Sequence, residues 1–177
     1  MTIDEYFEFE ENASLRHEYV NGYVYAMSGP SLAHVRTTSE LLVAFKTHLR
    51  GKPCEAFATD AKLRISDDVV YYPDLVVACN REEWASHYLC NPKLVIEVLS
   101  PSTKHIDRRE KALTYRRVAS IEEYALLKQD EHELTLHRRS EEWKPHVYTG
   151  PQAIAEFHSV ALSVPLSEIY AGTLPTQ

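Results

Sequence analysis

The stretch from Pro92 to Lys111, "PKLVIEVLSPSTKHIDRREK", decides the fold because it joins a strand-like run to a charged segment through a Ser/Pro turn. One carboxylate, Glu97, interrupts the apolar run over residues 94–99. A buried carboxylate without a partner costs several kcal/mol, so such a group is normally paired, protonated or bound to a metal ion. The rest of the sequence must therefore supply a partner for Glu97.

A second acid lies inside strand-like sequence, in "VVYYPDLVVACN" over residues 69–80, where Pro73 and Asp74 break the apolar run. Proline at a strand start or bulge can turn the next side chain away from regular pairing. Two acids on neighbouring strands can partner each other only through a shared proton or a cation, because their like charges otherwise repel. Their oxygen donors suit Mg²⁺ or Mn²⁺, which take one or two carboxylates and keep several waters. The sequence thus predicts a cation site at Asp74 and Glu97.

A basic group beside Glu97 would most simply stand two residues later, because side-chain direction along a strand repeats every two residues. That position holds Leu99, but the helix predicted next offers a substitute. Its residues Asp107, Lys111 and Tyr115 share one helical face at spacings of four residues. If the turn "SPST" folds this helix back over the strand end, Lys111 reaches the acids. There it could orient or deprotonate an attacking water, or offset charge on a phosphoryl group.

Turn and capping signals place the other elements along the chain. Thr2 and Glu5 have the spacing of a capping box, and Asn21-Gly22 marks a two-residue hairpin turn. We expect a short first helix, a hairpin over 16–28, a long helix over 31–50, strands over 55–59, 61–65 and 69–78, a short helix or loop over 80–89, a strand over 93–99, a second long helix over 105–118, a hairpin over 123–138, a strand near 147 and a helical turn within 163–170. This order predicts one α/β (α+β) domain over residues 1–177, with a central mixed sheet flanked by helices.

Composition narrows the class of protein. The 177 residues are 44% hydrophobic and 25% charged, which is ordinary for a globular domain. The N-terminal sequence is acidic and does not have the pattern of a signal peptide, so we expect a cytoplasmic protein. The single cysteines Cys54, Cys79 and Cys90 predict buried thiols rather than a disulfide framework, and nothing has the spacing of a zinc site.

The formal net charge of −7 weighs against a nucleic-acid partner unless basic residues gather locally. One candidate phosphate-facing run follows the turn: Lys104, Arg108, Arg109, Lys111, Arg116 and Arg117. A solvated helix face is the alternative interpretation of this run.

The runs "YYPDLVV" and "PKLVIEVLSPSTKHIDRREKALTY", together with "RHEYVNGYVYAMSGPSLAHVRTTSELL" and "IEEYALL", resemble the Uma2 family (formerly DUF820) of the PD-(D/E)xK nuclease superfamily. The resemblance covers most of the chain. It implies a restriction-endonuclease-like fold and Mg²⁺-dependent hydrolysis of phosphodiester bonds, with Mn²⁺ as a possible substitute. It also implies a nucleic-acid substrate, DNA in the first place, and, by analogy, a homodimer. No apolar run approaches the roughly 20 residues of a membrane span, so we expect no membrane association.

The same resemblance implies roles for individual residues. Asp74 takes the "PD" place, Glu97 is the second acid, and Lys111 replaces the lysine that usually stands two residues after that acid. The backbone carbonyl of Val98 would face the metal. Glu18, in "RHEYVNG", and His34, at the start of the long helix, match further residues of the family and are the remaining candidates for the catalytic site.

Each of these residues also has a simpler interpretation. Asp74 could cap a turn or pair with a nearby arginine, Glu97 could face solvent from an edge strand, and Lys111 could be a solvated helix residue. Glu18 could be a surface acid of the hairpin, and His34 a helix residue that bonds to the backbone. Asp107 could cap the helix or orient Lys111, and Ser100 and Ser102 could shape the turn. For the whole protein, the alternatives are a catalytically silent module that binds a protein partner or nucleic acid, and a hydrolase of smaller phosphoesters.

Overall fold

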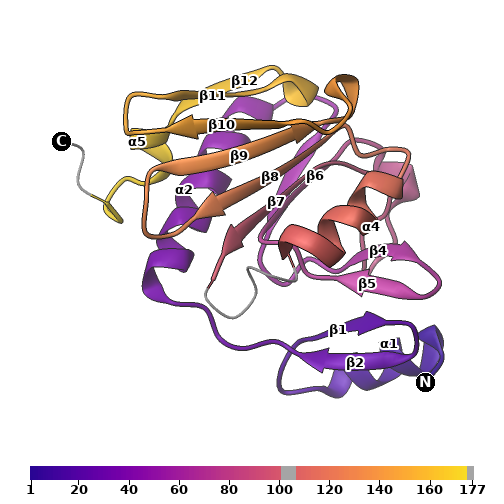
Figure 1. Ribbon diagram of the computed structural model, residues 1–177. Coiled ribbons are helices and arrows are strands. Elements are labelled where there is room, and N and C mark those ends of the chain that lie inside the picture. The colour runs from indigo at the N-terminus through magenta and orange to yellow at the C-terminus, as the bar shows by residue number, and fades with distance from the viewer. Residues whose placement is uncertain (101–106, 175–177) are drawn as a thin grey trace.

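A six-stranded mixed sheet forms the centre of the computed structural model, which describes residues 1–100 and 107–174 (Figure 1). Its strands are β3 (Glu55–Ala58), β6 (Leu75–Ala78), β7 (Pro92–Leu99), β8 (Glu123–Lys128), β9 (Glu133–Arg138) and β10 (Pro145–Thr149). They lie in the order β10-β9-β8-β7-β6-β3. The β7–β8 pair is parallel and the other pairs are antiparallel, as the prediction of a mixed sheet requires.

Helices cover both faces of this sheet. Helix α2 (Leu32–Leu49) covers one face, and a π-helical turn, η2 (Asp107–Lys111), continues into α4 (Ala112–Arg117) on the other (Figure 1). Strand β7 alternates between the two cores, with Ile96 and Val98 on the α2 side and Val95 and Leu99 on the α4 side. Glu97 therefore belongs to the face that η2 and α4 cover.

A smaller sheet carries the N-terminal hairpin. Its strands are β1 (His17–Val20), β2 (Tyr23–Ala26), β4 (Leu63–Ser66) and β5 (Val69–Tyr71), in the order β2-β1-β5-β4. Helix α1 (Ile3–Asn12) packs against it through a buried cluster of Tyr6, Tyr19 and Val70. The capping box at the start of α1 and the turn at Asn21-Gly22 form as predicted.

Two short C-terminal strands, β11 (Ile154–Phe157) and β12 (Leu162–Pro165), form a hairpin that the sequence did not predict, and α5 (Leu166–Ile169) follows. The other elements among residues 1–100 and 107–174 are three turns of 3₁₀ helix: η1 (Arg81–Glu83), η3 (Arg139–Glu141) and η4 (His158–Val160). No helix in the described part of the chain is long and apolar enough to cross a membrane.

The strand expected over residues 69–78 is divided in the structure. Its first half, β5, lies in the small sheet and its second half, β6, in the large one. Pro73 cannot donate a ladder hydrogen bond, so the chain leaves one sheet at Tyr72-Pro73-Asp74 before it enters the other. Residues 101–106, which include Ser102, Lys104 and the expected helix start at 105, lie outside the described residues, as do the side chains of Asp107 and Arg108.

The prediction of unbridged cysteines is wrong for two of the three. Cys54 and Cys79 form a disulfide across 25 residues of sequence. Strands β3 and β6 pair with Glu55 opposite Ala78, so the next residues outward, Cys54 and Cys79, also lie opposite each other. This strand register cannot be read from cysteine spacing alone. Cys90, which is half-buried, is not part of the bridge.

Candidate active site

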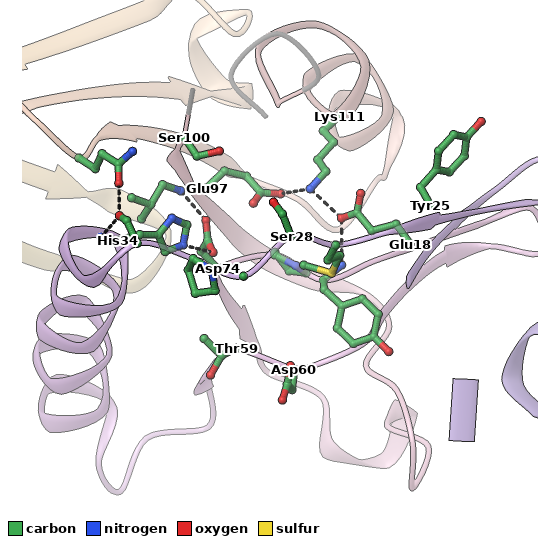
Figure 2. Close-up of a pocket in the computed structure, with 18 of the residues that line it drawn as sticks. Glu18, Tyr25, Ser28, His34, Thr59, Asp60, Asp74, Glu97, Ser100 and Lys111 are labelled. Atoms are coloured by element: carbon green, nitrogen blue, oxygen red, sulfur yellow. Dashed lines mark hydrogen bonds and ion pairs between the residues drawn. The ribbon is translucent and has the colours of Figure 1, made fainter. Parts of the chain in front are cut away.

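A pocket of about 470 Å³ brings together the side chains that the sequence singled out (Figure 2). The residues that line it include Glu18, His34, Asp74, Glu97 and Lys111 together with Val98. They come from both sheets, from the first turn of α2 and from the last residue of η2. All six predicted site residues therefore share one cavity.

Asp74 is held from two sides. It stands directly before β6, whose first residue Leu75 pairs with Ile96, so Asp74 continues the register toward Glu97. The Val98 backbone N–H donates to Asp74 Oδ2 at 2.7 Å, and His34 Nε2 lies 2.6 Å from Oδ1. The carboxylate is therefore fixed against the end of β7, beside Glu97.

His34 reaches Asp74 from the start of α2, where the Ser31 side chain caps the helix by accepting from the His34 backbone N–H at 3.1 Å. Its other ring nitrogen, Nδ1, is buried and has no hydrogen-bond partner among the described residues. An N–H group buried without an acceptor is rarer than an unsatisfied acceptor, so we assign the ring proton to Nε2. In this tautomer His34 donates to Asp74 and orients its carboxylate.

Glu97 lies in a buried cluster with Lys111 (Figure 2). Lys111 Nζ is 3.2 Å from Glu97 Oε1 and 2.8 Å from Glu18 Oε1, so one ammonium group contacts two carboxylates. Tyr115 donates its hydroxyl to the same Glu97 oxygen at 3.0 Å. The Tyr72 backbone N–H donates to Glu18 Oε1 at 3.4 Å. Glu97 therefore has donors on the α4 side, the side to which strand alternation assigns it.

The electrostatics of this cluster follow from its burial. Glu97 is 3% exposed and Lys111 5%, so neither the solvent-facing glutamate nor the solvated lysine of the simpler interpretations describes them. Lys111 Nζ also lies 5.2 Å from the centre of the Tyr71 ring, a cation–π contact. Burial, and next the charge of Glu97, raise the pKa of Tyr115 well above its ordinary value, so its hydroxyl stays protonated as a donor.

The donor set of the pocket is suited to a hard cation. No group of three or more His, Cys, Asp or Glu side chains with a metal-binding arrangement occurs within residues 1–100 and 107–174. What the structure offers is a pair of carboxylates, Asp74 and Glu97, next to the backbone of Val98. Mg²⁺ is commonly held by one or two carboxylates with waters completing its shell, so this set fits Mg²⁺ better than zinc. Coordination by the Val98 carbonyl stays a prediction.

Among the described members of the basic run after the turn, Lys111 lines the pocket and Arg109, Arg116 and Arg117 do not. Lys111 points into the pocket, whereas Arg109 and Arg117 are exposed and Arg116 is half-buried. Its remaining members, Lys104 and the side chain of Arg108, lie outside the described residues. The one described cation of the run that reaches the site is thus already in contact with two glutamates.

Sequence reasoning missed the wall of the pocket formed by the segment "YAMSGPS" over residues 25–31. A usable signal was present, because this segment connects the hairpin that carries Glu18 to the helix that carries His34. It also missed Glu10, which is fully buried and accepts from the Tyr72 hydroxyl at 2.8 Å and the His17 backbone N–H at 3.0 Å. This acid ties α1 to the chain just before Pro73-Asp74, and its helical position gave no sign of that role.

Comparison with known proteins gives consistent results. Residues 3–167 match the model of the Uma2 family, whose description is "Putative restriction endonuclease". "Uncharacterized protein slr1290" of Synechocystis is 33% identical over 176 residues, 97% of this chain and 92% of that protein. "Uncharacterized protein sll1609" of the same organism is 30% identical over 133 residues, 73% and 75% of the two chains.

A solved structure also resembles this chain. The crystal structure of a "putative nuclease belonging to DUF820" from Anabaena variabilis superposes with a TM-score of 0.82 and 20% identity, covering 98% of this chain and 99% of the other. At this level of identity the likeness shows the fold.

Proposed function

This chain belongs to the Uma2 family, and from that membership and the geometry of its pocket we propose that it is a Mg²⁺-dependent endonuclease of nucleic acid. The observation that carries the proposal is that Asp74 and Glu97 line one pocket at the end of β7, with Lys111 in contact with Glu97. Separately, each of these residues has an ordinary structural role. Together in one cavity they form the acid–acid–lysine set that phosphodiester hydrolysis uses.

Asp74 and Glu97 would hold the cation, and the Val98 carbonyl lies in the same stretch of backbone. When bound, Mg²⁺ neutralises charge on the phosphoryl oxygens and lowers the pKa of a bound water. Mn²⁺ has similar ligand preferences and would serve the same site.

The other residues prepare the site for hydrolysis. Lys111 contributes a fixed positive charge and would position and polarise the water that attacks the phosphodiester. Glu18 holds the Lys111 ammonium group in place through its 2.8 Å contact. His34 and the Val98 N–H keep the Asp74 carboxylate oriented toward the pocket, so the groups need little rearrangement during the reaction.

A catalytically silent module that binds nucleic acid or a protein partner is the second candidate. The net charge of −7 favours this candidate over the nuclease. The contact of the pocket's lysine with two glutamates leaves little positive charge for a phosphate, which favours a protein partner over nucleic acid within it. The expected homodimer and the cytoplasmic location stay predictions, which analytical ultracentrifugation and cell fractionation would test.

The test is cleavage of supercoiled plasmid, linear duplex, single-stranded DNA and RNA in Mg²⁺, Mn²⁺ or EDTA. We expect cleavage that requires the metal and falls roughly 100-fold or more in Asp74→Asn, which removes a ligand charge. Asp67→Asn is the matched control, because Asp67 has an 86% exposed side chain in the β4–β5 turn. The proposal is wrong if no substrate is cut in a metal-dependent manner, or if Asp74→Asn cuts as fast as Asp67→Asn. Metal-dependent binding without cleavage would support the silent module.

A further inference from the structure

Tyr25 lies beside the charged cluster but takes no part in it. In the β1–β2 hairpin it is the direct cross-strand partner of Glu18, the acid that contacts Lys111. Side chains of such partners point to the same face of a sheet with their Cβ atoms about 5 Å apart. Figure 2 shows Tyr25 next to Glu18 at one end of the drawn residues. An aromatic ring therefore stands beside Glu18, the acid that contacts the proposed catalytic lysine.

This ring is exposed although it lines the pocket. Tyr25 is 55% exposed, and among residues 1–100 and 107–174 no other ring stacks on it. Other tyrosines near the site are occupied, since Tyr71 packs edge-on against Tyr115 and Tyr72 donates its hydroxyl to Glu10. Tyr25 thus offers an open aromatic face, the group on which a nucleobase of any identity can stack.

The charge around the pocket argues against an intact duplex as the ligand. Of the described residues that line the pocket, one is a lysine or arginine, and four are acidic: Glu18, Asp60, Asp74 and Glu97. Duplex binding depends mainly on several lysines and arginines that neutralise phosphates. Stacking on aromatic rings contributes affinity that does not depend on such neutralisation. The described composition of the pocket therefore favours a ligand recognised through its base as well as its phosphate.

The size of the pocket leads to the same conclusion. A cavity of about 470 Å³ lies within the range of roughly 300–1,000 Å³ that holds one small organic molecule. A single nucleotide is a ligand of that size, and enzymes that act on one base reach it by taking it out of the helical stack. A base pair within a stack cannot enter such a cavity.

From these observations we infer that Tyr25 stacks on an unpaired base next to the scissile phosphate, so that the site acts on single-stranded nucleic acid or on unpaired nucleotides. The inference rests on the proposed nuclease function, because it places the phosphate of that nucleotide at Asp74 and Glu97. Tyr25 is then a specificity residue that distinguishes unpaired from paired nucleotides and does not distinguish one base from another.

The experiment measures binding and cleavage separately. Binding is followed by fluorescence anisotropy of a labelled oligonucleotide in Ca²⁺, using single-stranded DNA, single-stranded RNA and the corresponding duplex. The proteins are the wild type, Tyr25→Ala, Tyr25→Phe and Tyr23→Ala. Tyr23 is the matched control, since it is a 69% exposed tyrosine two residues earlier on the same strand that does not line the pocket. Cleavage of the same substrates is then measured in Mg²⁺.

We expect the wild type to bind single strands more tightly than duplex, and the DNA and RNA arms to show which sugar is preferred. Loss of a stacking partner in Tyr25→Ala should weaken single-strand binding by roughly 5- to 100-fold. Tyr25→Phe keeps the ring, and Tyr23→Ala lies outside the pocket, so both should stay within about twofold of wild type.

The inference is overturned if duplex binds as tightly as the single strand, if neither binds, or if Tyr25→Ala behaves like Tyr23→Ala. These outcomes differ from failure of the proposed function. Metal-dependent cleavage without strand preference would sustain the nuclease and reject the role of Tyr25. Tyr25-dependent single-strand binding without cleavage in any metal would sustain the stacking site and reject the nuclease.

Discussion

Replacing Lys111 by Met tests whether the acid–lysine cluster is built as the structure shows. Methionine keeps most of the length and apolar character of the lysine stem, so contact with the Tyr71 ring can persist. The ammonium group is lost, however, and it lies 2.8 Å from Glu18 and 3.2 Å from Glu97. Two carboxylates, with side chains 15% and 4% exposed, would then lose their contact with this ammonium group.

The size of the effect follows from this burial. Removing one partner of a buried ion pair costs about 3–5 kcal/mol, because it leaves the other charge unpaired. Glu18 keeps the Tyr72 N–H and Glu97 keeps the Tyr115 hydroxyl, so we expect a loss near the lower value, about 3 kcal/mol. For a domain of this length each kcal/mol lowers the melting temperature by about 2–4 °C, which gives a decrease of about 6–12 °C.

The assay is urea unfolding of Lys111→Met, Glu97→Gln and the double variant, together with Mg²⁺-dependent cleavage. Glu97→Gln in the Lys111→Met background removes one of the two carboxylate charges that have lost the ammonium group, so the two changes should be non-additive by about 1–3 kcal/mol. Arg117→Met, at an exposed position in the last turn of α4, is the stability control and should change the free energy of unfolding by less than about 0.5 kcal/mol. The reasoning is refuted if Lys111→Met is as stable as Arg117→Met, or if the two changes simply add.

Three further predictions concern other parts of the molecule. Tyr115→Phe removes a hydrogen-bond donor from Glu97, so it should lower the free energy of unfolding in urea by about 1.5–3 kcal/mol. It should also raise the Mg²⁺ concentration needed for half-maximal cleavage by about tenfold, because Glu97 is then less well oriented. An unchanged Mg²⁺ requirement would contradict a role of Tyr115 in orienting Glu97. Burial raises the pKa of five tyrosines above the value near 10 at which they ionise in the unfolded chain. The unfolded state therefore loses these protons first, and stability should fall as the pH rises above about 10, which melting temperatures across that range would measure. The five are Tyr6, Tyr71, Tyr72, Tyr115 and Tyr170. The Cys54–Cys79 bridge joins residues separated by 25 positions in the sequence. Reducing it with dithiothreitol, or replacing both cysteines by serine, should lower the free energy of unfolding by about 3 kcal/mol in the same assay. No change in this free energy would argue that the bridge does not form in solution.

The centre of the site could be predicted because its signals are local. Glu97, the turn after it and Lys111 lie within 20 residues of one β–α unit, so strand alternation and helix spacing were enough to bring the lysine toward the acid. Asp74 could be added because its strand-like surroundings predicted a neighbouring strand. These contacts form between elements that are close in the sequence, so they do not depend on the pairing of distant strands.

What could not be predicted depends on long-range register. The Cys54–Cys79 bridge exists because β3 and β6 pair in one particular register, and the division of residues 69–78 between two sheets depends on a hairpin some 50 residues earlier. The contact between Glu18 and Lys111 joins β1 of the small sheet to η2, about 90 residues later in the chain, and only family resemblance suggested Glu18. Strands β11 and β12 were missed because four-residue strands carry little alternation to read.

The position of the lysine has a structural reason that the sequence alone only suggested. Leu99, two residues after Glu97, is 7% exposed and packs in the same core as Ala112 and Tyr115. Its side chain therefore helps to pack β7 against α4. A lysine at position 99 would interrupt this core, whereas Lys111 enters the pocket from the last residue of η2 and leaves the core apolar. The same packing sets Tyr115 over Glu97. Transferring the charge to the helix therefore makes the orientation of Glu97 and the packing of α4 depend on each other. Leu99→Lys combined with Lys111→Leu should accordingly fail to restore cleavage even though it keeps the charge count.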